Sequence, residues 1–187
     1  MKHYIKNITS FSPEKEAEFL SLLDEEKLIQ FNSTTNKNRK KALLISQGIS
    51  KEIIAEEFGI NINELVFSVT DSGKPFCKSH GNIYFSISHS GDFVAVATNE
   101  NEVGIDIELM KIPTEKLIER ICCENEKNFI ASSENKEKAF TEIWTKKEAY
   151  LKALGTGIDR ELKTVDTTKL TFFTEYHDDF IVSVFCL

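Results

Sequence analysis

The sequence has few cysteines, few prolines and a single tryptophan, and it lacks any long apolar run. Of its 187 residues, 4 are cysteine and 3 are proline. The apolar runs are only a few residues long, so we expect no membrane-spanning helix. No apolar core follows the first residues, so we predict no secretion signal. The cysteines form no C-x-x-C pair, which makes a zinc site an unlikely use of the four histidines. These absences favour a reduced protein of the cytoplasm.

The charge of the chain is acidic overall but uneven. The formal net charge of −7 argues against a general nucleic-acid partner. Basic residues nevertheless gather at 37–41 and again at Lys146, Lys147 and Lys152. The distribution suggests small anionic ligands such as phosphates, and the alternative is that these lysines only solvate helix faces.

Apolar spacing and turn residues predict short strands set between two groups of helices. Ser12-Pro13 is a helix start, and Gly59 and Gly155 are helix stops. Helices are expected at 13–30, from about 39 to 58, at 114–122, at 124–131 and at 136–154. Strands are expected at 66–69, 83–88, 93–97 and 103–109, with a last hairpin of 169–174 and 180–186.

A weak internal sequence similarity suggests that the pattern of helices followed by strands occurs twice. The segment 89–96 resembles the segment 177–184, because each starts with His and continues into an apolar strand. We therefore predict an α+β fold of two similar lobes, residues 1–104 and 105–187, with the active site at their interface. Each lobe is expected to pack helices on a small, mainly antiparallel sheet.

Two acidic residues alternate with apolar ones in the strand expected at 103–109. Ile105, Ile107 and Leu109 then point to the core, while Asp106 and Glu108 project together from the other face. Neighbouring carboxylates repel each other unless a cation, a proton or solvent relieves the charge. The pattern fits a magnesium site, and the alternative is an exposed acidic strand edge.

Three further motifs carry polar groups suited to a phosphate ligand. On the helix expected at 136–154, Glu148 and Lys152 are four residues apart and share a face, as in a metal and phosphate site or a surface ion pair. Ser86-Ile-Ser88-His89-Ser90-Gly91 follows an apolar strand, and Gly73-Lys74-Pro75 forms a turn. No partnered nucleophile surrounds His89, so a hydrolase triad is not indicated.

In their order along the chain, from Gly73-Lys74-Pro75 to Lys152, the four motifs resemble the signature of the 4'-phosphopantetheinyl transferase superfamily. The resemblance covers residues 73–157 and is to the surfactin-synthetase-activating type, a pseudo-dimer within one chain, rather than to the short trimeric holo-acyl-carrier-protein synthases. It implies an enzyme that moves the phosphopantetheine arm of coenzyme A to a serine of a fatty-acid, polyketide or nonribosomal-peptide carrier protein, with 3',5'-ADP as the other product. It also implies a monomer that uses Mg²⁺ and binds neither nucleic acid nor membrane.

The resemblance assigns roles residue by residue. Asp106, Glu108 and Glu148 resemble the Mg²⁺ ligands, and Lys152 resembles the lysine that contacts the coenzyme A phosphates. The remaining nucleotide contacts and the general base are implied at other positions: Ser88 and His89 at the 3'-phosphate, Lys74 and Pro75 at the nucleotide edge, Lys41 (or Arg39 or Lys40) at the start of the second helix, Lys27 as the one good lysine near the front, and Glu126 (or Glu124, or a metal-bound water) as the base.

Two other functions remain as alternatives. A magnesium-dependent coenzyme A or nucleotide pyrophosphatase also uses three carboxylates, and a non-catalytic coenzyme A-binding protein could retain them. The presence of all three carboxylates together with Lys152 favours the transferase.

Overall fold

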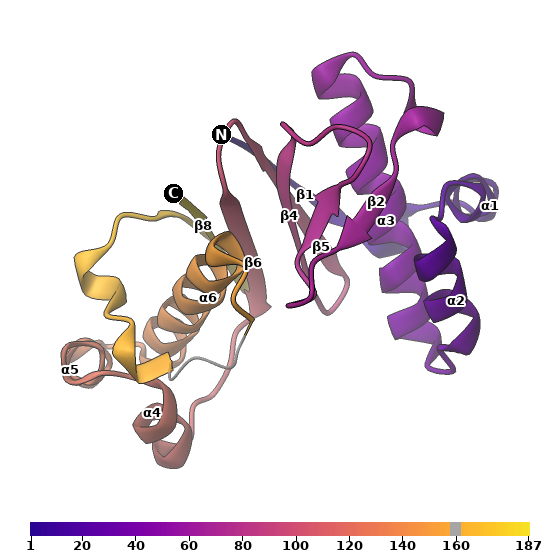
Figure 1. Cartoon of the computed structure of the whole chain (residues 1–187). Helices are drawn as coiled ribbons and strands as arrows, with labels where there is room; N and C mark the ends of the chain where they lie inside the picture. Colours follow the sequence, from indigo (N-terminus) through magenta and orange to yellow (C-terminus); the bar gives the residue numbers. More distant parts are fainter. Residues whose placement is uncertain (158–161) are drawn as a thin grey trace.

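Two three-stranded antiparallel sheets occupy the middle of the molecule (Figure 1). The computed structural model describes residues 1–157 and 162–187. One sheet has the strand order β1-β5-β4 and the other the order β6-β8-β7, while β2 and β3 pair separately. The strands are β1 (Lys2–Asn7), β2 (Phe67–Val69), β3 (Pro75–Cys77), β4 (Tyr84–Ser90), β5 (Phe93–Asn99), β6 (Val103–Leu109), β7 (Phe173–Tyr176) and β8 (Phe180–Cys186).

The helices form two groups that flank the sheets on opposite sides (Figure 1). The first group packs near β4 and β5, and α6 of the second group packs on β6 and β8. Within residues 1–157 and 162–187, none of the helices is long and apolar enough to cross a membrane. The helices are α1 (Pro13–Ser21), α2 (Glu25–Ser33), α3 (Lys37–Phe58), α4 (Glu115–Ile121), α5 (Glu124–Ser132) and α6 (Lys136–Leu154).

The predicted α+β class is confirmed, and most predicted elements lie within a few residues of the observed ones. The strand at 103–109 and the helix at 136–154 have the predicted bounds. Asn135 caps α6 by accepting a hydrogen bond from Lys138 N at 2.9 Å, and Gly155 ends the helix with a φ of 66°. The division into lobes of residues 1–104 and 105–187 stays a prediction.

The single helix predicted at 13–30 is wrong, because the chain turns between α1 and α2. Lys51, on α3, donates from Nζ to the Leu22 carbonyl oxygen at 2.8 Å and to Asp24 Oδ1 at 3.0 Å. The other Asp24 oxygen accepts from Phe67 N at 3.0 Å. These tertiary bonds hold the turn, so local helix propensity does not decide it. Strand β1 was also not predicted; it pairs with β5 along six residues.

Gly104 allows α6 to approach β6 closely. A Cβ at this position would lie 1.9 Å from the Ala149 carbonyl oxygen and 2.5 Å from Ala153 N. These are backbone atoms of α6, so the helix and the strand would have to separate to admit a methyl group. Because Glu148 lies on α6 and Asp106 on β6, this contact also sets the spacing between those two side chains.

Gly104→Ala is therefore expected to lower the free energy of unfolding by roughly 1–3 kcal/mol, the usual range for forced overpacking. Urea denaturation of the wild type and the variant measures the change. Gly81→Ala is the matched control, because a Cβ at Gly81 meets nothing within 4 Å. Equal stability of Gly104→Ala and the wild type would show that α6 and β6 are not in this contact.

Candidate active site

Strand β6 places two carboxylates on the face that meets α6 and β4. Ile105 and Ile107 are fully buried in the core on the other face, as the alternation predicts. The same prediction is wrong for Leu109, which ends the strand and is 37% exposed. Asp106 is only 4% exposed, and Glu108 is partly buried. The two acids therefore line the inside of the molecule at the junction of the sheets, and the alternative of an exposed acidic strand edge is wrong.

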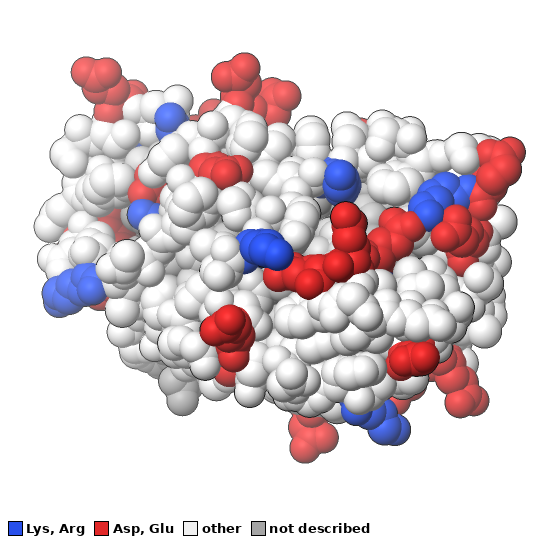
Figure 2. All heavy atoms as spheres, turned by 90° about the horizontal axis from the view of Figure 1, so that it is seen from above, with Lys and Arg blue, Asp and Glu red and all other residues white. Residues whose placement is uncertain are grey.

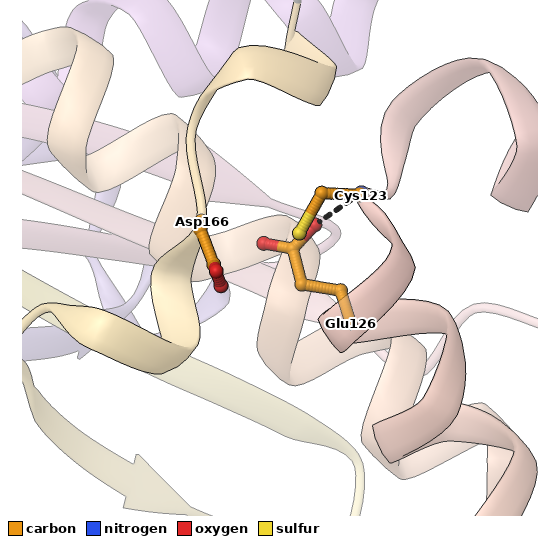
Figure 3. A group of neighbouring side chains, drawn as sticks. All are labelled: Cys123, Glu126 and Asp166. Atoms are coloured by element: carbon orange, nitrogen blue, oxygen red, sulfur yellow. Dashed lines mark hydrogen bonds between the residues drawn. The ribbon is translucent and has the colours of Figure 1, made fainter.

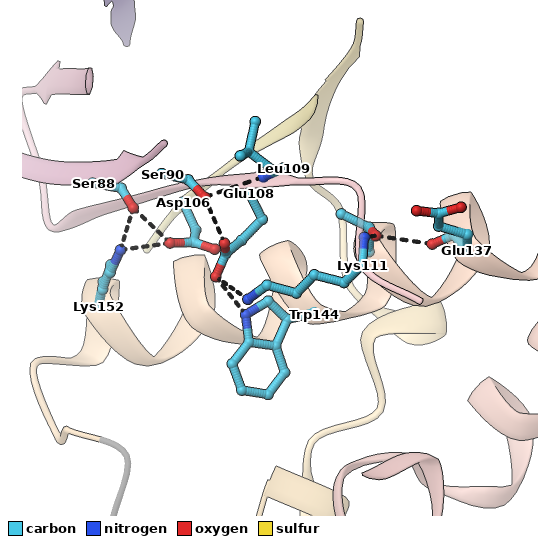
Figure 4. Close-up of polar contacts among 10 residues, drawn as sticks. Ser88, Ser90, Asp106, Glu108, Leu109, Lys111, Glu137, Trp144 and Lys152 are labelled. Atoms are coloured by element: carbon cyan, nitrogen blue, oxygen red, sulfur yellow. Dashed lines mark hydrogen bonds and ion pairs between the residues drawn. The ribbon is translucent and has the colours of Figure 1, made fainter. Parts of the chain in front are cut away.

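One oxygen of Asp106 is fully hydrogen-bonded and the other has no protein partner. Oδ1 accepts from Ser88 Oγ at 2.7 Å and from Lys152 Nζ at 2.7 Å (Figure 4). Oδ2 is buried without a hydrogen-bond partner among the described residues. Burial raises the pKa of Asp106, Lys152 opposes this shift, and the charge of Glu108 adds to it.

Glu108 is held by three donors. Its Oε2 accepts from Ser90 Oγ at 2.9 Å, and its Oε1 accepts from Trp144 Nε1 at 2.8 Å and from Lys111 Nζ at 2.6 Å (Figure 4). Lys111 also lies over the Trp144 ring, with Nζ 4.9 Å from its centroid. This shell fixes the direction of the carboxylate.

Glu148 reaches the same region from α6. The residue is 8% exposed, and its Oε1 is buried without a hydrogen-bond partner among the described residues. Burial raises its pKa first, and the charges of Asp106 and Glu108 raise it further. The structure thus brings the three predicted acids together from a strand and a helix.

These residues fit a hard divalent cation. Within residues 1–157 and 162–187, two buried carboxylate oxygens, Asp106 Oδ2 and Glu148 Oε1, have no hydrogen-bond donor, and a buried anionic oxygen without a partner is costly. Oxygen ligands from carboxylates are those that Mg²⁺ uses, usually together with water and substrate phosphates. The side chains of the three carboxylates would have to move closer together to bind one ion. Their ligand atoms do not all lie within 4.8 Å of one another, as those of a second group of side chains do.

That second group consists of Cys123, Glu126 and Asp166, whose ligand atoms all lie within 4.8 Å of one another (Figure 3). A buried ammonium stands beside it, with Lys147 Nζ 2.7 Å from Glu126 Oε2. Burial also raises the pKa of the Cys123 thiol, which keeps it protonated. A positive charge and a protonated thiol disfavour a metal ion here, so we assign none.

Glu126, the sequence-predicted base, is placed in this buried group. The residue is 0% exposed. Oε1 accepts from Thr167 N at 3.0 Å and Thr167 Oγ1 at 2.8 Å, while Oε2 accepts from Cys123 N at 2.9 Å and pairs with Lys147. A carboxylate with these partners joins α5, α6 and the segment at Thr167, and this geometry does not favour a base role. The alternative, Glu124, is exposed and pairs with Lys127.

One cavity adjoins Glu148, and a second adjoins Ser88, a residue that donates to Asp106. The first, of about 250 Å³, has Lys74, Pro75, Glu148 and Lys152 in its wall. The second, of about 170 Å³, is lined by Lys27, Pro75, Ser88 and His89, among others. Both have Gly73, Pro75 and Ile87 in their walls. Most of the predicted coenzyme A contacts therefore line two adjacent hollows.

Two lysines that were predicted to contact coenzyme A are paired with acidic side chains of the protein. Lys74 pairs with Glu102 and donates to the Ala153 carbonyl oxygen at 2.8 Å, although its side chain lines the first cavity. Lys41 pairs with Glu16 at 2.6 Å and lines neither cavity. The structure thus does not bring Lys41 to the other predicted contacts.

The surface combines acidic side chains with local basic ones, as the charge distribution along the sequence does. Figure 2 shows acidic side chains forming a band across the middle of one face, with lysine or arginine side chains beside it. The overall charge is negative, and the positive charges next to the acids are local. Such a surface suits a small anionic ligand better than a long polyanion.

Sequence reasoning missed several groups that shape the site. Ser90, Lys111 and Trp144 all bind Glu108. Gln47 of α3 lines the second cavity. Ser90 has a detectable signal, because it continues the alternation of Ser86 and Ser88, but a serine alternation alone does not say which group lies opposite.

Two family models match consecutive parts of the chain. The model described as "4'-phosphopantetheinyl transferase, N-terminal" matches residues 11–101, and the model of the 4'-phosphopantetheinyl transferase superfamily matches residues 102–183. Together they cover nearly the whole chain in the expected order.

Curated relatives carry the same description. The chain is 29% identical to 4'-phosphopantetheinyl transferase ffp of Bacillus subtilis and 25% identical to Sfp of Bacillus subtilis (strain 168), each over 175 residues, which are 92% of this chain and 75% of the relative. It is 32% identical to psf-1 of Bacillus pumilus over 123 residues, 65% of this chain and 53% of psf-1.

Among solved structures, the holo-[acyl-carrier-protein] synthase (AcpS) of Thermotoga maritima aligns with 44% of this chain and 60% of its own length, at 25% identity and a TM-score of 0.37. The family assignment does not depend on this partial match. The two family models, the relatives and the acidic site together place the chain in the 4'-phosphopantetheinyl transferase superfamily, among members of the Sfp-like type.

Proposed function

We propose that this chain transfers the 4'-phosphopantetheine arm of coenzyme A to a serine of an acyl or peptidyl carrier protein and releases 3',5'-ADP. The observation that carries the proposal is the pair of buried, unpartnered oxygens, Asp106 Oδ2 and Glu148 Oε1, beside Lys152 and next to a cavity. The names of the relatives support the same reaction.

Asp106, Glu108 and Glu148 would hold Mg²⁺. When bound, the ion neutralises charge on the phosphate oxygens and orients them. Lys152 Nζ lies 2.7 Å from Asp106 Oδ1 and 2.8 Å from Ser88 Oγ. A flexible ammonium in this position offers a point charge to the diphosphate of coenzyme A.

The chain's other residues bind and orient the nucleotide. Ser88 and His89 line the second cavity with Lys27, and we propose that they face the 3'-phosphate region. Lys74 and Pro75 line the first cavity and are proposed at the nucleotide edge. Lys41 would reach the nucleotide only after leaving Glu16.

In the reaction, the carrier serine oxygen attacks the β-phosphorus of coenzyme A. A new P–O bond to the serine forms while the bond from the β-phosphorus to the bridging oxygen breaks, and that oxygen leaves with 3',5'-ADP. The serine hydroxyl gives its proton to a base, for which Glu126 and a water molecule at the metal site are the two candidates. Positioning and electrostatic stabilisation dominate such transfers. Glu126 was predicted to accept the proton, but its buried contacts support a positioning role. It pairs with Lys147 of α6, the residue directly before Glu148.

A mass assay tests the function. Apo-carrier protein, coenzyme A and Mg²⁺ are incubated with the chain, and the carrier is expected to gain the mass of phosphopantetheine. Omitting Mg²⁺ in the presence of a chelator is expected to remove the gain. Unmodified carriers of all three classes, fatty-acid, polyketide and nonribosomal-peptide, would contradict the proposal.

The same assay separates the alternatives. Cleavage of coenzyme A without a carrier would identify a pyrophosphatase, and tight binding of coenzyme A without turnover would identify a non-catalytic binder. We further propose a monomer, since all proposed ligands come from one chain, and light scattering would reveal a trimer. The free state of all four cysteines is consistent with our proposal of a cytoplasmic location.

A further inference from the structure

Strands β4 and β6 lie beside each other, although they belong to different sheets. Ser86, Ser88 and Ser90 alternate along β4, so their side chains share one face. All three hydroxyls bond to β6. We call them the serine row. Side chains, rather than a backbone ladder, thus join the two sheets at the active site.

Ser86 and Ser90, at the two ends of the serine row, take the place of the carbonyl oxygens that a neighbouring strand would offer to β6. Ser86 Oγ accepts from Ile105 N at 3.1 Å, and Ser90 Oγ accepts from Leu109 N at 3.1 Å. Each bond satisfies a β6 amide that has no strand partner on this side. Of these two end residues, Ser90 also contacts a carboxylate, that of Glu108.

The groups around Ser90 allow its hydroxyl proton to point toward only one acceptor. A serine hydroxyl carries a single proton. Since the Leu109 amide can only donate, Ser90 Oγ is the acceptor of that bond. A carboxylate only accepts, so the hydroxyl proton goes to Glu108 Oε2, 2.9 Å away (Figure 4). The amide therefore orients the hydroxyl toward Glu108.

The bond from Ser90 acts on the Glu108 oxygen that Lys111 and Trp144 do not touch. Those two side chains both donate to Oε1. Held at one oxygen alone, a carboxylate can pivot about that point. A third donor on Oε2 fixes its plane, which is what a metal ligand requires, since outer donors orient the ligand and tune its affinity.

We propose that Ser90 is a positioning residue that holds Glu108 in the orientation that binds Mg²⁺. The proposal rests on the proposed function, because it takes Glu108 as a metal ligand. Ser90 does not itself touch the ion or the substrate. Its effect is expected in metal affinity, separate from its effect on stability.

An isosteric pair of variants isolates the hydroxyl. Ser90→Thr keeps the hydroxyl, and Ser90→Val has a methyl group in its place. The Thr and Val side chains have nearly the same shape, and both residues suit a strand. Ser86→Ala is the matched control, because it removes a hydroxyl from the same face that serves an amide but no carboxylate. Since Ser86 also lines the first cavity, the Mn²⁺ affinities of all variants are compared both with and without coenzyme A. Ser90→Ala is added as the smallest deletion in case Ser90→Val does not fold.

Binding of Mn²⁺ is measured by electron paramagnetic resonance with and without coenzyme A, and thermal unfolding is measured without metal. Ser90→Val and Ser90→Ala are expected to bind Mn²⁺ about tenfold more weakly, the lower end of the usual loss of an outer partner. The Mg²⁺ concentration for half-maximal transfer is expected to rise likewise, while kcat at saturating Mg²⁺ changes less. Ser90→Thr is expected to bind as the wild type does. Ser86→Ala is expected to melt at a lower temperature with unchanged Mn²⁺ affinity.

Two results would overturn the proposal while leaving the metal centre intact. One is equal Mn²⁺ affinity in Ser90→Val, Ser90→Ala and the wild type. The other is an equal loss in Ser86→Ala, which would show that loosening the sheets is sufficient. Failure of the wild type to bind Mn²⁺ would instead overturn the proposed function, and the role of Ser90 with it.

Discussion

Asp106→Asn is expected to lower the rate of carrier modification by about a thousandfold, which corresponds to about 4 kcal/mol of transition-state stabilisation. The amide retains the shape of the side chain and can still accept from Ser88 and Lys152, but it offers no charge to a cation. The rate of appearance of holo-carrier, followed by mass spectrometry at several Mg²⁺ concentrations, measures the effect.

The same substitution is not expected to unfold the protein. Burial raises the pKa of Asp106, so without a cation the charged carboxylate opposes folding at neutral pH. This penalty is present above the folded pKa and disappears as the pH falls toward the ordinary aspartate value of 3.8. Asp106→Asn removes it, and the metal-free variant is therefore expected to unfold at the same or a higher urea concentration.

Glu175→Gln provides the matched control. Glu175 lies on β7, in the same sheet as Asp106, and accepts from His3 Nε2 at 2.9 Å if that nitrogen is protonated. It pairs with His3 and His177 and with no described residue of the carboxylate site, so its loss of charge is expected to leave transfer unchanged. Full activity of Asp106→Asn, or an equal loss in Glu175→Gln, would contradict a metal role for Asp106.

Glu126→Gln is expected to lower the free energy of unfolding by about 3–5 kcal/mol. Glu126 and Lys147 are both 0% exposed, and their charged atoms lie 2.7 Å apart. Gln keeps the volume but leaves the ammonium of Lys147 buried without a counter-charge. Among the described residues, its remaining acceptors are then neutral, such as the carbonyl oxygens of Leu162 at 2.7 Å and Val165 at 2.5 Å. Equilibrium urea denaturation measures the loss.

Lys147→Met separates a structural role of Glu126 from a catalytic one. It breaks the same pair from the other side and is expected to cost a similar free energy. If the pair only positions α6, both variants should transfer at a similar rate per folded molecule. If Glu126 is the base, Glu126→Gln should lose far more kcat than Lys147→Met, and that result would restore the base role predicted from the sequence.

Much of the candidate site follows from short-range geometry. The alternation along residues 103–109 placed Asp106 and Glu108 on one face, and helical spacing placed Glu148 and Lys152 on another. The partners of those groups did not follow. Trp144 meets Glu108 only because α6 packs against β6. Lys111 lies three residues after Glu108, but its spacing alone did not show that it would donate to that carboxylate. Glu126 pairs with Lys147 only because α5 packs against α6.

The fold divides in the same way. Long periodic segments such as α6 were predicted with their bounds, because their caps and apolar spacing are local. The break between α1 and α2 was not predicted, because Lys51 and Phe67 hold it from distant parts of the chain. Strand β1 was likewise missed, since its pairing with β5 joins residues more than eighty positions apart.

By itself, the sequence determined the α+β class, the order of most elements and which acidic side chains share a face, because these depend on periods of two and of 3.6 residues within one segment. Only the tertiary structure decided which oxygens of Asp106 and Glu148 lack a protein donor, that Glu126 is enclosed with Lys147, and that the serine row joins the sheets. These outcomes depend on how separate segments pack, and a hydrogen bond or a buried charge between them has no signature in either segment alone.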